Sequence, residues 1–184
     1  TTTVKLTASE TAAEGGSVIY TATVGAPVTG SPVVVTLANG QSITIAVGQT
    51  TGTATTTAPN DVLAGHTPLT NSITNVTGGN YENLVADKTP VSTTVTDTVD
   101  TTTVSLTATG NVNEGGQIVY TATLNNPAGT PVTVTLSNGS TITIDAGKTT
   151  GTVTVPAPVD DVYKDAGKVE VTIKDATGGN FESL

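Results

Sequence analysis

The 184-residue chain carries a net charge of -9 with only six lysines, no arginine and no cysteine. A chain this acidic lacks the basic surface with which proteins bind nucleic acids and anionic membranes, which excludes both as partners. Without cysteine it forms neither a disulfide nor a thiolate metal site, and no apolar run is long enough to insert into a bilayer. The chain begins at Thr1 without Met or a signal peptide, and we interpret it as an internal fragment of an exported protein.

An internal repeat organises the chain. Residues 1–24 and 101–124 are identical at 14 of 24 positions, and the match continues through most of both copies. Each copy has about 100 residues, a common size for a domain that folds on its own. We therefore predict two domains, 1–99 and 100–184. The second has no counterpart of residues 85–100, so its last strand is expected to be missing.

Apolar and polar residues alternate along short segments, which is the pattern of half-buried β-strands. In the second copy Val104, Leu106 and Ala108 are expected to face a core, while the residues between them face solvent. Seven short strands favour an all-β fold of two tandem immunoglobulin-like β-sandwich domains, with a β-barrel as the alternative. The expected strands are 103–108, 118–124, 132–136, 142–144, 153–155 and 169–173 in the second copy, and 90–97 in the first.

The sequences of two connecting segments predict their local structure. Asn138-Gly139 predicts a two-residue hairpin turn in which both residues have positive φ. The segment 160–167 is the only stretch in which we expect a turn of helix.

The carboxylates of the first copy fall in particular loops. If the strands are labelled A to G, the A–B loop, the E–F loop and the end of strand G lie at one pole of a seven-stranded sandwich. Glu14, Asp61, Asp97 and Asp100 occupy these segments. Clustered like charges repel one another unless a cation is present, and oxygen ligands in loops favour Ca²⁺ over Zn²⁺. We therefore predict that these four carboxylates form a Ca²⁺ site at the junction of the copies.

The second copy repeats part of this acidic pattern. Glu114, Asp160 and Asp161 take the corresponding positions, but no strand-G carboxylates follow them, so we expect an incomplete site. Asp175 is expected in the F–G loop at the opposite pole of the second domain, from which it could supply one more ligand at the junction.

The sequence gives no support for catalysis. His66 stands alone in a loop, and we interpret it as a solvated side chain. No nucleophile–base pair or closed catalytic metal set can be assembled, so we predict that the protein is not an enzyme. A ligand- or glycan-binding module is the alternative function. It is disfavoured because aromatic residues are few, and Tyr20 and Tyr120 are expected to face inward.

The segment Thr101–Leu124 contains Thr-Thr-Val-x-Leu-Thr-Ala, Glu-Gly-Gly and Tyr-Thr-Ala-Thr-Leu. It resembles the extender repeats of giant bacterial RTX adhesins, which include the large biofilm adhesin of pseudomonads. The acidic, threonine-rich linker at 97–103 fits the same family. A more distant likeness to Calx-β domains rests on Glu-Gly-Gly and on the acidic loop before the sixth strand.

The resemblance implies a structural role at the bacterial cell surface. Such repeats link end to end as a monomeric rod whose partners are neighbouring repeats of the same chain. They hold an adhesive tip away from the cell and stiffen when Ca²⁺ binds at their junctions. The resemblance supports Glu14, Asp61, Asp97 and Asp100 as ligands. The first copy has Asn60-Asp61-Val62 where the second has Val-Asp-Asp, which implies a weaker first site or fewer ions there.

Overall fold

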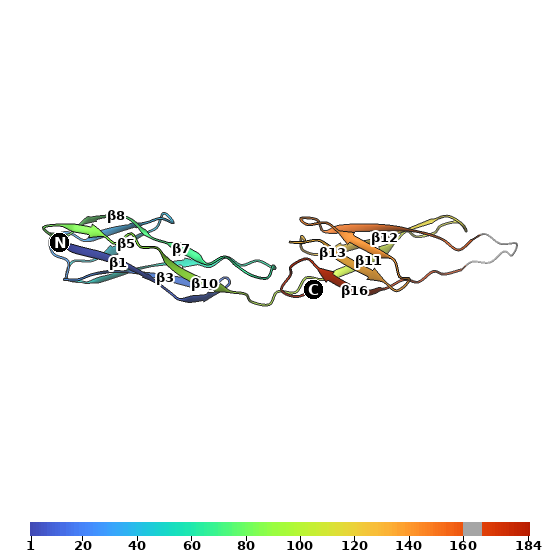
Figure 1. Ribbon diagram of the computed structural model, residues 1–184, viewed down its shortest axis with the longest axis horizontal. Helices are drawn as coiled ribbons and strands as arrows, with labels where there is room; N and C mark the ends of the chain where they lie inside the picture. The colour runs from blue at the N-terminus through green and yellow to red at the C-terminus, as the bar shows by residue number, and fades with distance from the viewer. Residues whose placement is uncertain (160–166) are drawn as a thin grey trace. The chain divides into compact units, whose positions relative to one another are not determined.

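The computed structural model describes residues 1–159 and 167–184, and these residues form β-strands and no helix (Figure 1). The predicted all-β fold is therefore confirmed. The chain divides into two compact units, which are described separately. Unit 1 comprises Thr1–Asn60 and Gly65–Thr98, and unit 2 comprises Asp61–Ala64 and Val99–Leu184. Within the described ranges, no helix is available that could cross a membrane.

Unit 1 consists of three small sheets. Their strand orders are β6-β3-β1-β9, β5-β4-β8 and β2-β10-β7. Most neighbouring strands are antiparallel, but β9 pairs in parallel with β1, and β10 pairs in parallel with β2. The strands are β1 (Thr2–Ala8), β2 (Thr11–Ala13), β3 (Ser17–Val24), β4 (Val33–Leu37), β5 (Ser42–Ile45), β6 (Thr51–Thr57), β7 (Leu69–Asn71), β8 (Ile73–Gly78), β9 (Leu84–Ala86) and β10 (Val91–Thr96).

Unit 2 repeats two of these sheets in its described residues. The orders β11-β12-β15 and β14-β13-β16 correspond to β1-β3-β6 and β5-β4-β8. The registers also correspond, because Val4 lies opposite Val24 in unit 1 and Val104 lies opposite Leu124 in unit 2. The strands are β11 (Val104–Ala108), β12 (Gln117–Leu124), β13 (Val132–Leu136), β14 (Thr141–Ile144), β15 (Thr150–Pro156) and β16 (Ile173–Gly178).

Alternate side chains of these strands build an aliphatic core in each unit. On β3, Val18, Tyr20 and Ala22 are buried, whereas Ile19 between them is 46% exposed. Tyr120 is buried in the same way in unit 2, which confirms the predicted inward orientation of both tyrosines. Threonine suits the outer faces, because its branched β-carbon favours strands while its hydroxyl remains solvated.

A short turn connects β9 to β10, which belong to different sheets. The Asp87 carboxylate accepts hydrogen bonds from the Thr89 backbone N–H at 3.0 Å and from its hydroxyl at 2.6 Å. These bonds stabilise the charged carboxylate and hold the pKa of Asp87 below its ordinary value.

Two local predictions need correction. Asn138-Gly139 does form a hairpin between β13 and β14, but only Gly139 has a positive φ, of 85°. The Gly139 N–H bonds to the Leu136 carbonyl, and the Leu136 N–H bonds to Ser140, so the loop is longer than two residues. The predicted strand at 169–173 begins only at Ile173 and continues to Gly178. The predicted helical turn at 160–167 lies almost wholly outside the described residues.

Gly52 allows a close approach between β5 and β6, and Gly151 does the same in unit 2. A Cβ atom on Gly52 would lie 2.4 Å from the Thr44 carbonyl oxygen, and one on Gly151 would lie 2.3 Å from the Thr143 oxygen. Since both neighbours are backbone atoms, they can yield only if a strand shifts.

We therefore predict that Gly52→Ala lowers the free energy of unfolding by about 1–3 kcal/mol, measured by urea denaturation. Gly25→Ala is the matched control, because a Cβ there meets no atom within 4 Å. The control should change stability by less than about 0.5 kcal/mol. Equal stabilities of the two variants would contradict the steric argument.

Candidate functional site

Glu14 is a buried carboxylate at the turn that follows β2. Its side chain has no exposed surface, although it carries an ionisable group. The Glu14 N–H donates to the Thr96 carbonyl at 3.0 Å, which ties this turn to the end of β10. The Gly15 N–H is directed to the carbonyls of Ala58 and Pro59, each at 3.2 Å. These backbone bonds fix the position of the Glu14 side chain.

Both oxygens of the Glu14 carboxylate have polar partners in unit 1. Glu14 Oε2 accepts hydrogen bonds from the Thr98 backbone N–H at 2.9 Å and from the Thr98 hydroxyl at 3.3 Å. Glu14 Oε1 contacts His66 Nε2. A charge buried in this way is tolerated only when it is paired and hydrogen-bonded, as here.

His66 lies between two carboxylates of unit 1. Its Nε2 atom contacts Glu14 and is 3.8 Å from Asp97 Oδ1, while Asp97 Oδ2 accepts a 2.7 Å hydrogen bond from the Gly65 N–H. The His66 side chain is 11% exposed, so its interpretation as a solvated residue is wrong. Sequence reasoning missed it because its carboxylate neighbours are distant in the chain.

The cluster of Glu14, His66 and Asp97 is suited to holding a cation. It offers carboxylate oxygens and one imidazole nitrogen, and Glu14 is common to both groups of side chains whose ligand atoms lie within 4.8 Å of one another. Carboxylate oxygens and an imidazole nitrogen are ligands that metal ions accept.

The second copy arranges its equivalent residues differently. Glu114 is exposed, whereas Glu14 is buried. The predicted ligands Asp160 and Asp161 lie outside the described residues. The sequence repeat thus does not extend to the burial of this glutamate.

The remaining predicted ligands belong to unit 2. Asp61 Oδ1 accepts a 2.7 Å hydrogen bond from the Leu63 N–H, which shapes its own loop. The Asp100 N–H donates to Glu182 Oε2 at 2.5 Å. Asp175 was expected in a loop, but it lies within β16 opposite Thr135. Asp61, Asp100 and Asp175 remain predicted ligands.

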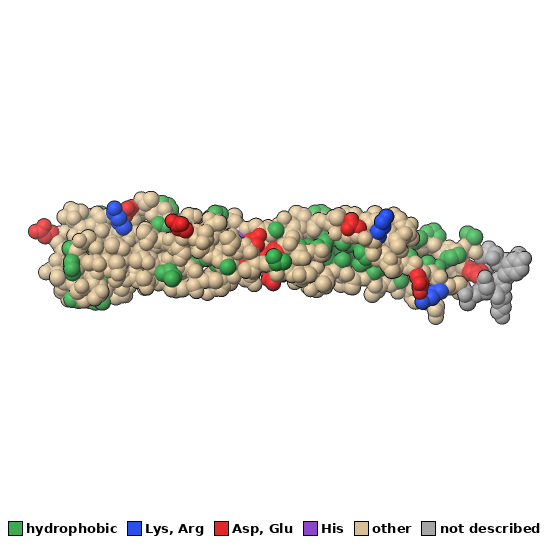
Figure 2. Space-filling view, turned by 90° about the horizontal axis from the view of Figure 1, so that it is seen from below, with side chains coloured by type: hydrophobic (Ala, Val, Ile, Leu, Met, Phe, Trp, Pro, Cys, Tyr) green, Lys and Arg blue, Asp and Glu red, His purple; other side chains and the backbone are tan. Residues whose placement is uncertain are grey.

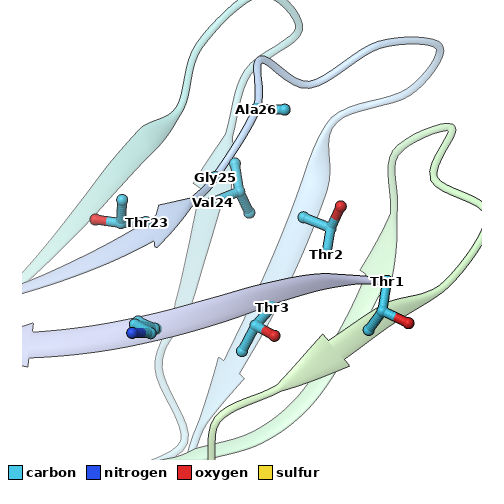
Figure 3. A pocket seen from close by; sticks show the side chains of 8 residues that line it. Thr1, Thr2, Thr3, Thr23, Val24, Gly25 and Ala26 are labelled. Atoms are coloured by element: carbon cyan, nitrogen blue, oxygen red, sulfur yellow. The ribbon is translucent and has the colours of Figure 1, made fainter.

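The surface hollow described in unit 1 lacks the lining that is typical of a small-molecule site. One open hollow in unit 1 lies where β1 begins and β3 ends, beside residues 23–26 (Figure 3). Its lining consists of threonines, Lys5 and small residues, without an aromatic side chain. The face shown in Figure 2 has few charged side chains, most of them acidic.

Comparison with known families finds a match. The profile of a family described as the LapA domain matches residues 1–98 and again residues 100–184. A comparison with curated proteins finds no match.

The unequal burial of Glu14 and Glu114 predicts unequal effects of substitution. Glu14→Ala removes the acceptor of the Thr98 N–H, and we expect it to lower the free energy of unfolding by about 1–3 kcal/mol. Glu114→Ala, at an exposed position of the second copy, should change it by less than about 0.5 kcal/mol. Urea denaturation in a chelating buffer measures both. A larger effect at Glu114 would contradict the assigned burial.

Proposed function

The chain belongs to the LapA domain family, that of the large adhesion protein LapA, and on this premise we propose that it is an extender segment of a bacterial surface adhesin. The match to both copies is the observation that carries this proposal, because a family segment repeated in one chain suits a spacer. In this proposal the protein is not an enzyme. Its two repeats, 1–99 and 100–184, are immunoglobulin-like β-sandwiches in a monomeric rod whose partners are neighbouring repeats.

We further propose that Ca²⁺ stiffens the connection between the repeats. The ligands would be Glu14, Asp61, Asp97 and Asp100, all of which offer the carboxylate oxygens that Ca²⁺ prefers. In support, Glu14 is buried and fixed by backbone hydrogen bonds. Asp97 lies beside His66, which also contacts Glu14. A bound cation would supply positive charge to carboxylates that otherwise repel one another.

The carboxylates of this site fit Ca²⁺, but the imidazole of His66 does not. Carboxylates and backbone carbonyls are hard oxygen ligands, whereas the imidazole of His66 is a ligand of transition metals. His66 would therefore leave Glu14 when Ca²⁺ binds and return when the ion is removed. Its role in this proposal is to hold the carboxylate in the ion-free state.

The stiffening effect follows from the position of the ligands along the chain. The two compact units divide between Thr98 and Val99, and Val99 is 79% exposed. Asp97 and Asp100 precede and follow this point, so one ion held by both would restrict the dihedral angles between them. Extracellular modules bind Ca²⁺ with Kd of about 10⁻⁴ to 10⁻³ M, so the stiff form would prevail outside the cell. The rod would then project a distal adhesive domain for attachment or biofilm formation.

We predict that 2 mM Ca²⁺, about twice the weakest Kd in this range, increases the radius of gyration of the chain measured by small-angle X-ray scattering. The chain carrying both Asp97→Asn and Asp100→Asn should show no such increase. Its affinity in calorimetric titration should be about tenfold lower, because two anionic ligands are lost.

Asp145→Asn is the matched control, since Asp145 is an exposed acid that belongs to none of the predicted sites. This variant should respond to Ca²⁺ like the unmodified chain. An unchanged radius of gyration for the unmodified chain in Ca²⁺ and in chelator would contradict the stiffening proposal.

A further inference from the structure

The chain contains two Asn-Gly pairs, and both form exposed hairpin turns. Asn39-Gly40 connects β4 to β5, and Asn138-Gly139 connects β13 to β14. In each turn the asparagine and the glycine are exposed, and the glycine has a φ of 85°. The two turns therefore share their sequence pair, their glycine conformation and their access to water.

Both turns leave the asparagine side chain open to attack by the next backbone nitrogen. Because glycine has no Cβ, no side chain shields its nitrogen, and asparagine is among the thermolabile residues. A Cβ added at Gly40 or at Gly139 would meet no atom within 4 Å. Each turn therefore has room for the ring that this attack forms.

The reaction needs only the chain and water. The Gly139 nitrogen bonds to Cγ of Asn138, the Cγ–Nδ2 bond breaks, and Nδ2 leaves as ammonia with the proton of the Gly139 N–H. Water then opens the resulting succinimide ring. Addition of water at Cγ gives aspartate, and addition at the backbone carbonyl carbon gives isoaspartate. No oxidant or reductant takes part.

The attacking nitrogens of the two turns are restrained alike. The Gly40 N–H donates to the Leu37 carbonyl at 3.1 Å, and the Gly139 N–H donates to the Leu136 carbonyl at 3.0 Å. Any difference in reactivity must therefore come from the asparagine side chains.

One hydrogen bond of the asparagine side chain is also common to both turns. Asn39 Oδ1 accepts from the Gln41 N–H at 3.1 Å, and Asn138 Oδ1 accepts from the Ser140 N–H at 3.0 Å. This bond restrains the carbonyl end of the amide and leaves the amino end, which departs in the reaction, unaffected.

Asn39 has further restraints on its amino group and backbone. Its Nδ2 donates to Gln41 Oε1 at 2.9 Å, and Gln41 Nε2 in turn donates to the Thr55 carbonyl at 2.9 Å. The Asn39 N–H also donates to Asn71 Oδ1 at 3.2 Å. The amide of Asn39 is thus held by a glutamine that is itself anchored to a strand.

The turn of unit 2 differs because two of these partners are replaced. Ser140 takes the place of Gln41, and Val171 takes the place of Asn71. Serine offers only a short hydroxyl, and valine offers no polar atom. Among the residues that the structure describes, the Ser140 N–H is the hydrogen-bond partner of the Asn138 side chain, and Nδ2 has no acceptor.

We propose that Asn138 is a site of spontaneous deamidation and that Gln41 protects Asn39 from the same reaction. As aspartate, residue 138 gains a negative charge and still accepts the Ser140 N–H, so the turn persists. As isoaspartate, it adds a methylene to the backbone between Leu136 and Ser140, whose N–H and carbonyl bond at 2.9 Å. That product opens the end of the hairpin.

The test compares the two asparagines within the intact chain, incubated at mildly alkaline pH in a chelating buffer so that Ca²⁺ does not contribute. Peptide mapping with fragment-ion mass spectrometry measures the conversion of amide to acid at each position. Asn138 should convert at least about fivefold faster than Asn39, because the hydrogen bonds of Gln41 must break before Asn39 reacts. An isoaspartyl methyltransferase should label the product at 138.

The chain unfolded in guanidinium chloride is the matched control for local sequence. Since the tertiary restraints are then lost, the two asparagines should convert at rates within about twofold of each other. A difference that persists in the unfolded chain would assign the effect to local sequence and not to the hydrogen bonds of the fold.

Two reciprocal substitutions isolate the role of the glutamine. Gln41→Ser should accelerate the conversion of Asn39 at least about threefold, and Ser140→Gln should slow that of Asn138 by a similar factor. Thr154 holds the place of Thr55 in unit 2, so its carbonyl is the matching acceptor for the new glutamine. Because the substitutions lie in different units, each remains informative if the other disturbs its hairpin.

Three results would overturn the proposal. The first is equal conversion of the two asparagines in the folded chain. The second is an Asn138 that stays intact in the folded chain while it converts in the unfolded one, since the turn alone would then protect it. The third is a pair of reciprocal variants whose rates match those of the unmodified chain.

Discussion

The pairing of β10 with β2 and β7 is the interaction on which the candidate cation site of unit 1 depends. These ladders bury Thr93 and Val95 and bring the end of β10 beside the turn after β2. The Thr98 N–H can then hold the Glu14 carboxylate, while the Glu14 N–H bonds to Thr96. A buried glutamate is stable only with such partners, so the candidate cation site depends on this strand.

The two copies differ in the burial of equivalent residues, among those that the structure describes. Glu114 and Glu14 both precede a Gly-Gly pair, yet Glu114 is exposed and Glu14 is buried. Leu106 is less buried than Leu6, although both have the same register to the next strand. In unit 1, burial at these positions depends on β10, which is distant from them in sequence, so the local pattern does not specify it.

The module combines an aliphatic core with a small group of ionisable side chains. Its core consists of aliphatic side chains without disulfides, and its outer faces are rich in threonine. His66 contacts Glu14 and lies near Asp97, and backbone hydrogen bonds to both carboxylates fix their positions. Such an arrangement is suited to binding a cation.

The sequence by itself determined the repeat, the all-β fold and most strand positions, because alternation of apolar residues is a local property. It also placed Glu14 and Asp97 among the candidate ligands. Only the tertiary structure decided that His66 touches Glu14 and that Asp175 lies in a strand. These facts depend on contacts between residues tens of positions apart, and local periodicity carries no information about which distant segments meet.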